Sequence, residues 1–257
     1  MEDLIAAVEA GDYARAYDAL QRTPEAATPV GAAVGAFLLA LIERFDEADQ
    51  LVQSADLQGF EVIVHGERQR TARWRDLAAQ GGFSAVAQTA TAPLHAAMAV
   101  AFVQRDQALA ERTKAELTKQ TRPRAGQLTF ADGKLKPFSN ITDCDDAIGQ
   151  MLETYCGDGL LYFPFEALQR IEVLPKTNFM DYLMPKVKLT TARGAIRAYV
   201  PLLYACSATS SIDTDRNGRI TRFDYLGGGR RGLGQRDFMV DHALVGLQSI
   251  ATIDFTA

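Results

Sequence analysis

The sequence contains few of the residues that usually build disulfide frameworks, metal sites or membrane spans. It has three cysteines, three histidines and one tryptophan among 257 residues. Cys144, Cys156 and Cys206 are an odd number without metal-type spacing, which predicts free thiols in a reducing compartment. The longest apolar run, Val30 to Ile42, has 13 residues, whereas a membrane span needs about 20. Because the chain opens on acidic residues, we expect no secretory signal, no membrane insertion and a cytoplasmic protein.

Charge is unevenly distributed along the chain, although the net charge is only −5. Residues 1–60 contain 11 acidic side chains against three arginines, whereas residues 216–236 contain six arginines and one acid, Asp224. The two ends therefore differ in electrostatic character. Four arginines surround Trp74 in residues 65–78, but the run is short and the chain is acidic. We expect a solvated helix face anchored by a buried Trp74, and no binding of nucleic acid.

The N-terminal half has the periodicity of helical hairpins. Apolar residues recur at helical spacing in residues 4–20, are interrupted at Gly11-Asp12, and follow the same pattern in residues 37–52. The equivalent positions are offset by 32 residues, close to the 34-residue period of tetratricopeptide (TPR) helix pairs, and they are Tyr13/Phe45, Ala16/Ala48 and Leu20/Val52. Residues 93–117 suggest a third pair with a different offset. We therefore predict a TPR-like helical domain, the alternative being a plain helical bundle.

The composition changes between Thr121 and Lys136, where prolines and glycines punctuate a polar stretch. Short β-type runs follow, with Gly157-Asp158-Gly159, Gly194 and Asn217-Gly218 as expected hairpin turns. Such closely joined runs predict an antiparallel sheet. The fold class is therefore α+β in two domains, residues 1–125 all-α and TPR-like, and residues 126–257 mostly antiparallel β.

Three acidic residues crowd together at Asp143, Asp145 and Asp146. Crowded carboxylates can bind a divalent cation or share a proton in catalysis. Short acidic side chains can also cap backbone amides at a turn and pair with an arginine such as Arg236. We favour capping, because no histidine or nucleophile motif accompanies the acids. Cys144 is flanked by acids, which disfavour its thiolate.

Two other segments match known motifs by spacing. Residues 213–224 have oxygen-bearing side chains and a glycine where a calcium loop requires them, but flanking helices are not expected and three arginines surround the segment. We predict a hairpin at Asn217-Gly218 and no tight calcium binding. Residues 227–232 satisfy G-x-G-x-x-G without a following helix, so we expect an arginine-bearing loop and no dinucleotide. His65-Gly66-Glu67 lacks the cysteines of a zinc deaminase, and His95 and His242 are isolated.

Four motifs in the second half occur in the order of one known family. They are the acid segment from Asp143 to Glu153, the segment Tyr162 to Glu166, the segment Pro201 to Tyr204 followed by Ser207, and the segment Gly232 to Arg236. Together they resemble the ImpE family, also called TagJ or SciE-type, with departures at Cys144, Ala147 and Gln150. The family-motif positions, structural or binding, are Asp143, Asp145, Asp146, Gly149, Glu153, Tyr162, Pro164, Glu166, Gly232, Gly234, Gln235 and Arg236.

The resemblance implies an accessory protein of bacterial type VI secretion that contacts the small subunit of the contractile sheath and the AAA+ ATPase that recycles it. It implies no enzymatic activity, no catalytic residue, no metal and no cofactor. From the sequence itself, a helical-repeat half is compatible with accepting a partner helix or peptide. Two alternatives remain open, a metal-dependent enzyme that uses Asp143, Asp145 and Asp146, and a generic TPR-like scaffold.

Overall fold

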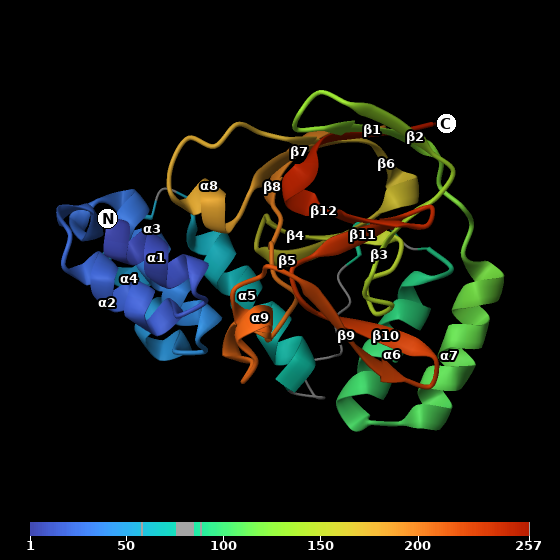
Figure 1. Ribbon diagram of the computed structural model, residues 1–257, viewed down its shortest axis with the longest axis horizontal. Helices are drawn as coiled ribbons and strands as arrows, with labels where there is room; N and C mark the ends of the chain where they lie inside the picture. The colour runs from blue at the N-terminus through green and yellow to red at the C-terminus, as the bar shows by residue number, and fades with distance from the viewer. Residues whose placement is uncertain (58, 76–84, 88, 257) are drawn as a thin grey trace.

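The computed structural model describes residues 1–57, 59–75, 85–87 and 89–256 and is an α+β protein (Figure 1). The helices of residues 1–120 form one end and one side of the molecule, and the strands that follow form the other end. The helices of the first half are α1 (Glu2–Glu9), α2 (Tyr13–Gln21), η1 (Pro24–Ala27), α3 (Pro29–Leu41), α4 (Phe45–Ser54), α5 (Glu61–Arg75), α6 (Ala92–Gln104) and α7 (Gln107–Gln120). No helix within the described residues is both long and apolar enough to cross a bilayer.

The predicted 32-residue repeat is present in the helical hairpins. α2 and α4 begin at the equivalent residues Tyr13 and Phe45, and Ala16 and Ala48 are fully buried. The turns are equivalent as well, since Gly11 and Glu43 both have left-handed backbone angles, with φ of 70° and 63°. The small alanines let neighbouring helices approach closely. The expected third pair is also helical, as α6 and α7.

The second half is mostly antiparallel β structure. An eight-stranded sheet has the order β2-β1-β13-β6-β7-β8-β4-β5, a three-stranded sheet has the order β12-β11-β3, and β9 and β10 form a separate hairpin. The strands are β1 (Gly126–Phe130), β2 (Leu135–Phe138), β3 (Ile141–Asp143), β4 (Met151–Cys156), β5 (Gly159–Pro164), β6 (Leu168–Val173), β7 (Lys186–Thr191), β8 (Gly194–Tyr199), β9 (Thr221–Leu226), β10 (Gly229–Gly234), β11 (Asp237–Val240), β12 (Ala243–Gly246) and β13 (Ile250–Phe255). The short helical turns are η3 (Phe165–Ala167), α8 (Met180–Leu183), η4 (Ser207–Thr209), α9 (Asp213–Arg216) and η5 (Leu247–Ser249).

Most of the expected turns are confirmed, and one is wrong. Two-residue turns join β4 to β5 at Gly157-Asp158 and β7 to β8 just before Gly194. The hairpin expected at Asn217-Gly218 does not exist, because α9 occupies residues 213–216 and Asn217 follows it. The hairpin forms instead between β9 and β10, around Gly227-Gly228, whose backbone φ angles are both positive. The β-type runs expected from the sequence correspond to β4, β5, β7, β8, β9 and β13, whereas β1 to β3, β6 and β10 to β12 were missed.

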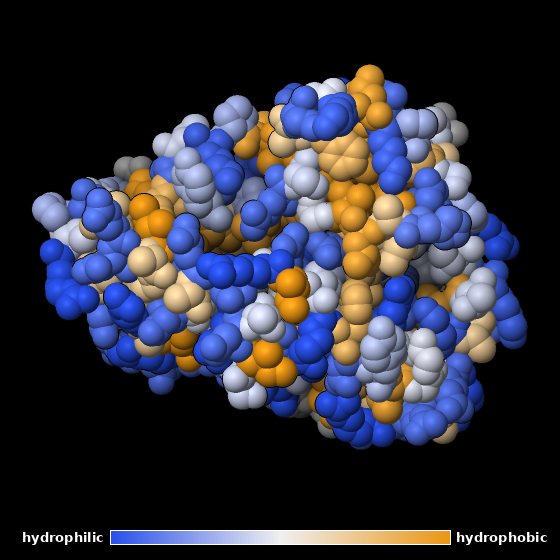
Figure 2. All heavy atoms as spheres, in the orientation of Figure 1, coloured by the Kyte–Doolittle hydropathy of each residue, from blue (hydrophilic) through white to orange (hydrophobic). Residues whose placement is uncertain are grey.

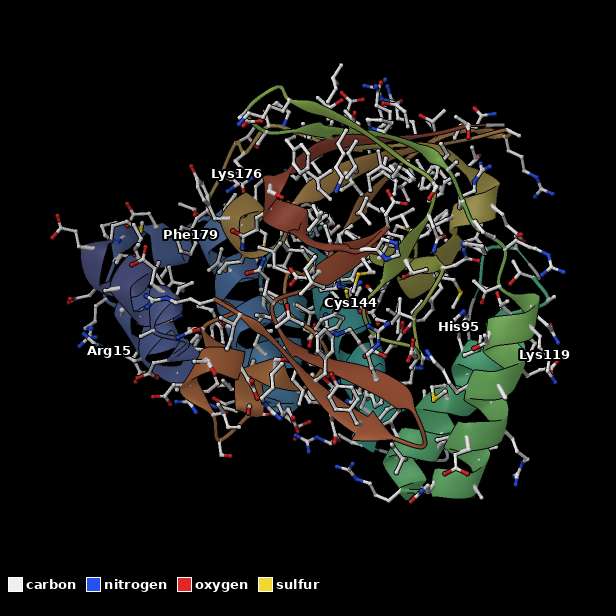
Figure 3. All side chains as sticks on the ribbon, turned by 45° about the vertical axis from the view of Figure 1, so that its right-hand side comes forward. Arg15, His95, Lys119, Cys144, Lys176 and Phe179 are labelled. Atoms are coloured by element: carbon white, nitrogen blue, oxygen red, sulfur yellow. The ribbon has the colours of Figure 1, made fainter. Side chains whose placement is uncertain are left out.

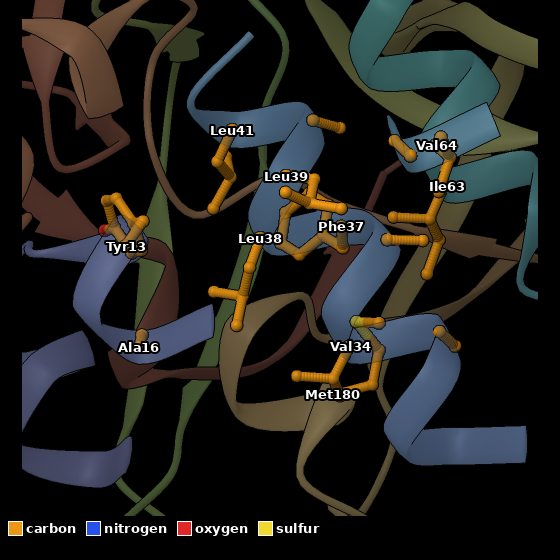
Figure 4. Packing of buried hydrophobic residues seen from close by; sticks show 14 of the residues in the cluster. Tyr13, Ala16, Val34, Phe37, Leu38, Leu39, Leu41, Ile63, Val64 and Met180 are labelled. Atoms are coloured by element: carbon orange, nitrogen blue, oxygen red, sulfur yellow. The ribbon is translucent and has the colours of Figure 1, made fainter. Parts of the chain in front are cut away.

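Separate apolar cores form under the helical hairpins and within the β structure. The β core takes buried side chains from both larger sheets, among them Leu128, Phe163, Val187 and Phe238. The helical core contains Val34 and Phe37 of α3 and also Met180 and Met184 from the α8 segment. Figure 4 shows Met180 beside Val34. The second half of the chain therefore contributes residues to the core of the first half.

Candidate functional site

The acid segment is a tight loop that the aspartate side chains fold by bonding to nearby backbone. Asp143 Oδ1 accepts a hydrogen bond from the Asp145 N–H at 2.8 Å, and Asp145 Oδ1 accepts one from the Ala147 N–H at 2.8 Å. The Asp143 N–H donates to the Gly149 carbonyl at 2.7 Å and closes the loop. Short carboxylates favour such turns because they replace a backbone acceptor two residues away. This is the capping arrangement that the sequence predicted.

The same loop binds two distant elements. Asp145 Oδ2 accepts from the Gly232 N–H of β10 at 3.2 Å, and Asp146 Oδ2 accepts from the Arg230 N–H at 2.8 Å. Asp146 also forms an ion pair with Lys114 of α7 at 2.8 Å. Gly232 has no room for a side chain, since an added Cβ would lie 2.4 Å from the Tyr204 ring. The loop therefore fixes the β9–β10 hairpin and α7 to the β structure.

Arg236 lies at the centre of a buried charge cluster. Its guanidinium forms ion pairs with Glu153 and with Asp143 Oδ2, the latter at 3.5 Å. Glu153 also accepts a hydrogen bond from the Tyr162 hydroxyl at 2.8 Å, and the Tyr204 hydroxyl donates to Asp143 Oδ1 at 2.8 Å. Arg236 is 0% exposed, and Glu153 and Asp143 are each 1% exposed. The predicted pairing of the acid segment with Arg236 is therefore present, together with Glu153.

Helix α5 adds buried charged groups that were expected to face solvent. Arg70 donates to the Tyr155 hydroxyl at 3.0 Å and to the Leu203 carbonyl at 2.8 Å, and its Nε lies 3.8 Å from Glu153. Arg73 donates to the Tyr162 hydroxyl and, at 3.3 Å, to the Ala147 carbonyl. Trp74 is buried as expected. The prediction of a solvated helix face is wrong for Arg70 and Arg73, which are buried. The part of that segment beyond Arg75 lies outside the described residues.

Burial dominates the electrostatics of the cluster. Burial raises the pKa of Asp143 to about 7, against the lowering effect of Arg236, and raises the pKa of Asp145 to about 6. Burial also acts to raise the pKa of Glu153, but Arg236 and Arg70 beside it bring that pKa below its ordinary value. Burial also raises the pKa of the Cys144 thiol well above its ordinary value. Glu153 is thus the firmly ionised carboxylate, and Cys144 is a poor nucleophile, as predicted.

His95, which seemed isolated in the sequence, packs against the acid loop. Its Nδ1 lies 2.8 Å from the Asp146 carbonyl oxygen, and its ring covers Gly149. Gly149 has a φ of 57°, and an added Cβ would lie 1.9 Å from the imidazole Cε1. A glycine is therefore required there by backbone angle and by space.

The remaining motif residues take structural positions, with one exception. Gly234 has a φ of 84°, and its N–H donates to Ser207 Oγ at 2.8 Å. Gln235 donates to Asp237 at 3.2 Å, and Pro164 is buried at the end of β5. Glu166 is exposed, and within the described part of the chain no side chain forms an ion pair or hydrogen bond with its carboxylate.

The acids of the calcium-like segment are paired with arginines. Asp215 is buried and holds Arg222 at 2.7 and 3.1 Å, and Asp224 holds Arg105 at 2.7 Å. Asp213 pairs with Arg216 in α9. Residues 227–232 were expected as a glycine-rich loop, but residues 229–232 belong to strand β10 instead. The Arg231 guanidinium lies over the Trp74 ring, 4.1 Å from its centre. Over the described residues, no three His, Cys, Asp or Glu side chains converge as metal ligands would.

A polar cavity of about 330 Å³ adjoins the outer side of the acid loop. Its lining includes His95 and Lys114 from the helices α6 and α7, and Asp143, Asp146 and Arg230 from the β structure. Both carboxyl groups in it already bind protein groups, Asp143 through Tyr204 and the Asp145 N–H, and Asp146 through Lys114 and the Arg230 N–H. The two carboxyl groups that line this cavity therefore hold other parts of the protein in place.

Comparison with known proteins shows a similar fold over the whole chain and a family match over its second half. The model of the family described as ImpE protein matches residues 136–254, which contain every motif position named above. No curated protein matches the sequence. A solved structure with a similar fold is protein VPA1032 from Vibrio parahaemolyticus, at a TM-score of 0.77 and 16% identity, covering 99% of this chain and 97% of that one. Residues 136–254 of this chain therefore match the ImpE family.

Proposed function

We propose that this protein is a non-enzymatic, cytoplasmic accessory protein of bacterial type VI secretion that acts by binding other proteins. The match to the ImpE family supports the secretion role. The helical hairpins of residues 1–54 support binding of a protein partner, because such repeats present concave surfaces to helices and peptides.

The observation that carries the proposal is the burial of the charged motif residues. Asp143, Glu153 and Arg236 are at most 1% exposed and bind one another. A catalytic acid or base has to reach a substrate proton. Residues that are enclosed and paired by charge are suited to holding the fold, so the motif favours a structural role over catalysis.

The family resemblance supplies the partners, which are the sheath small subunit and the sheath-recycling AAA+ ATPase, as for TagJ-type proteins. Calorimetric titration of the purified chain with each purified partner from the same organism tests this. We expect saturable binding of at least one partner. Absence of binding to both would remove the secretion role and favour the generic TPR-like scaffold.

The enzyme alternative is tested separately. With millimolar Mg²⁺ or Ca²⁺, we expect no turnover of phosphoester substrates above that of a matched Asp146→Asn variant. Turnover that the wild type shows and this variant lacks would replace the adaptor proposal with a metal-dependent enzyme.

A further inference from the structure

A cleft lies where the helical hairpins meet the β structure. It has a volume of about 180 Å³, and α1, α3, α5 and α8 contribute to its walls together with residues 201–203. Much of the lining is apolar, from Val8, Phe37, Leu41, Leu183 and Leu203. Figure 2 shows a hollow between the helical end and the β structure, with apolar atoms inside it and polar side chains at its rim. The cleft is thus on the side of the helical repeats that faces the rest of the molecule.

Part of the helical surface beside the cleft is already covered by the α8 segment of the same chain. Met180 and Met184 are fully buried in the same core as Val34 and Phe37, while Tyr182 between them is 58% exposed. The helical surface therefore accepts large apolar side chains from a short helical segment, here its own α8. The cleft is the part that α8 leaves unfilled, between α8 and the helices α1 and α2.

One polar acceptor lies at the base of the cleft. Glu67 is 3% exposed and lines the cleft together with Arg70. Its Oε2 accepts from the Tyr155 hydroxyl and lies 3.4 Å from Arg70, but no donor among the described residues bonds to Oε1. Because none of these protein donors binds this oxygen, it is free to accept a hydrogen bond from a ligand in the cleft.

We propose that the cleft is the docking site for an amphipathic segment of a protein partner, which inserts one aromatic side chain bearing a hydrogen-bond donor, Trp or Tyr. The volume suits such a ring, since an apolar protein cavity of about 150 Å³ holds benzene. Aromatic side chains with a polar tip are also the commonest anchors of interfaces. Residues 1–60 carry 11 acids against three arginines, so basic residues are expected to flank the anchor. This inference rests on the proposed function as an adaptor.

The matched pair Val8→Trp and Ile5→Trp tests the cleft without replacing any residue of the buried charge cluster. Both residues are on α1, but Val8 lines the cleft, whereas Ile5 is 41% exposed and does not. A tryptophan at residue 8 should fill the cleft. Circular dichroism and thermal unfolding establish that both variants are folded before binding is measured.

The first measurement uses indole as the probe and detects its binding to the full chain by ligand-detected NMR. We expect saturable indole binding that Ile5→Trp retains and Val8→Trp loses. Benzothiophene, which has the same shape without the N–H, should bind about tenfold more weakly, because it leaves Glu67 Oε1 without a donor. Indole binding that Val8→Trp leaves unchanged, or no indole binding to the wild type, would overturn the proposed site.

The second measurement titrates the sheath small subunit into the same three proteins. We expect Val8→Trp to weaken binding at least tenfold relative to wild type and Ile5→Trp to leave it unchanged. Equal binding by all three would overturn the cleft as the docking site and leave the adaptor function standing. Indole binding at the cleft without binding of the subunit would instead reject the sheath partner, and with it the cleft as a docking site for that partner.

Discussion

The Asp146 carbonyl determines which ring nitrogen of His95 is protonated. Because the Asp146 carbonyl can only accept, the Nδ1 that lies 2.8 Å from it must be protonated, which leaves Nε2 unprotonated in the neutral ring. Burial lowers the pKa of His95 to about 4. Between this value and the ordinary value near 6.5, the unfolded chain binds a proton that the folded chain does not. His95 therefore lowers the free energy of unfolding as the pH falls from about 6.5 to 4.

We predict that nitrogen-detected NMR of His95 shows the neutral Nδ1–H tautomer at pH 6. The raised pKa values of Asp143 and Asp145 have the opposite effect on stability, since these groups bind protons more tightly in the folded chain. A stability curve alone would mix the three groups, so the imidazole signals are the appropriate measurement. An imidazolium spectrum at pH 6 would contradict the buried, neutral state.

Two motif glutamates with opposite environments give a matched comparison. Glu153→Gln leaves Arg236 and Arg70 without their shared counter-charge, and removing one partner of a buried pair costs about 3 to 5 kcal/mol. Glu166→Gln changes an exposed group and should stay within about 0.5 kcal/mol of wild type. Urea unfolding followed by circular dichroism measures both. Equal midpoints for the two variants would show that the cluster contributes nothing.

The sequence predicted individual charges less well than turns. Asp143 and its neighbours were placed correctly as caps, because an aspartate turn depends only on residues next to it in the chain. Arg70 and Arg73 were not, since their partners Tyr155, Tyr162 and Glu153 are in the other half of the chain. A basic helix face looks the same in sequence whether it meets water or a buried carboxylate.

At the scale of elements, the β4–β5 hairpin and the acid loop each contain a glycine with a left-handed backbone. Gly149 and Gly157 have φ angles of 57° and 59°, but only Gly149 meets another group, the His95 ring. We predict that Gly157→Ala costs about 1 to 2 kcal/mol for the backbone alone. Gly149→Ala should cost clearly more, as measured by thermal unfolding.

A second substitution distinguishes the contact from the backbone effect. Adding His95→Ala to Gly149→Ala should recover part of the loss, because the ring that meets the new methyl group is gone. Strictly additive costs would show that the two residues do not interact.

The element pattern was predictable where it is local. The helix pairs repeat after 32 residues, and the two-residue hairpins were expected from their glycines. The prediction of a hairpin at Asn217-Gly218 was wrong because the helical turn α9 begins at Asp213, just before it. The ion pair between Asp213 and Arg216 supports this turn. The strand β10 was missed because glycines at 229, 232 and 234 suggest a loop. At Gly232 the glycine instead allows the Tyr204 ring to pack against the strand.

At the scale of the whole molecule, we propose the division of the chain into a helical part, residues 1–125, and a β part, residues 126–257. The two share the buried cluster, because α5 supplies Arg70 and Arg73, and α8 fills part of the helical core. A fragment of residues 126–257 would leave Glu153 without Arg70 and expose Met180 and Met184.

We therefore expect the 126–257 fragment to unfold at a lower temperature than the full chain, and to be stabilised when the 1–125 fragment is added. Differential scanning calorimetry of the separate and mixed fragments measures this. A 126–257 fragment as stable as the whole chain would contradict a shared cluster that matters for folding.

The central claim is that the acid motif holds the fold and does not catalyse, and Asp145→Asn tests it most directly. Both Asp145 oxygens accept backbone N–H groups, from Ala147 and Gly232, and an asparagine can satisfy only one. The orphaned N–H costs about 1 to 3 kcal/mol. For a chain of this size that lowers the melting temperature by about 2 to 4 °C per kcal/mol.

Melting temperature and type VI secretion activity are measured on the same Asp145→Asn variant, with Asp158→Asn in the exposed β4–β5 turn as the control. The account predicts a lower melting temperature for Asp145→Asn, with partner binding and activity kept in the protein that remains folded. Crowded acids in a functional site repel one another, and replacing one of them keeps or raises stability while activity is lost. An Asp145→Asn variant that is as stable as wild type or more stable, and has lost its activity, would therefore contradict the account and place the acid loop in an active site.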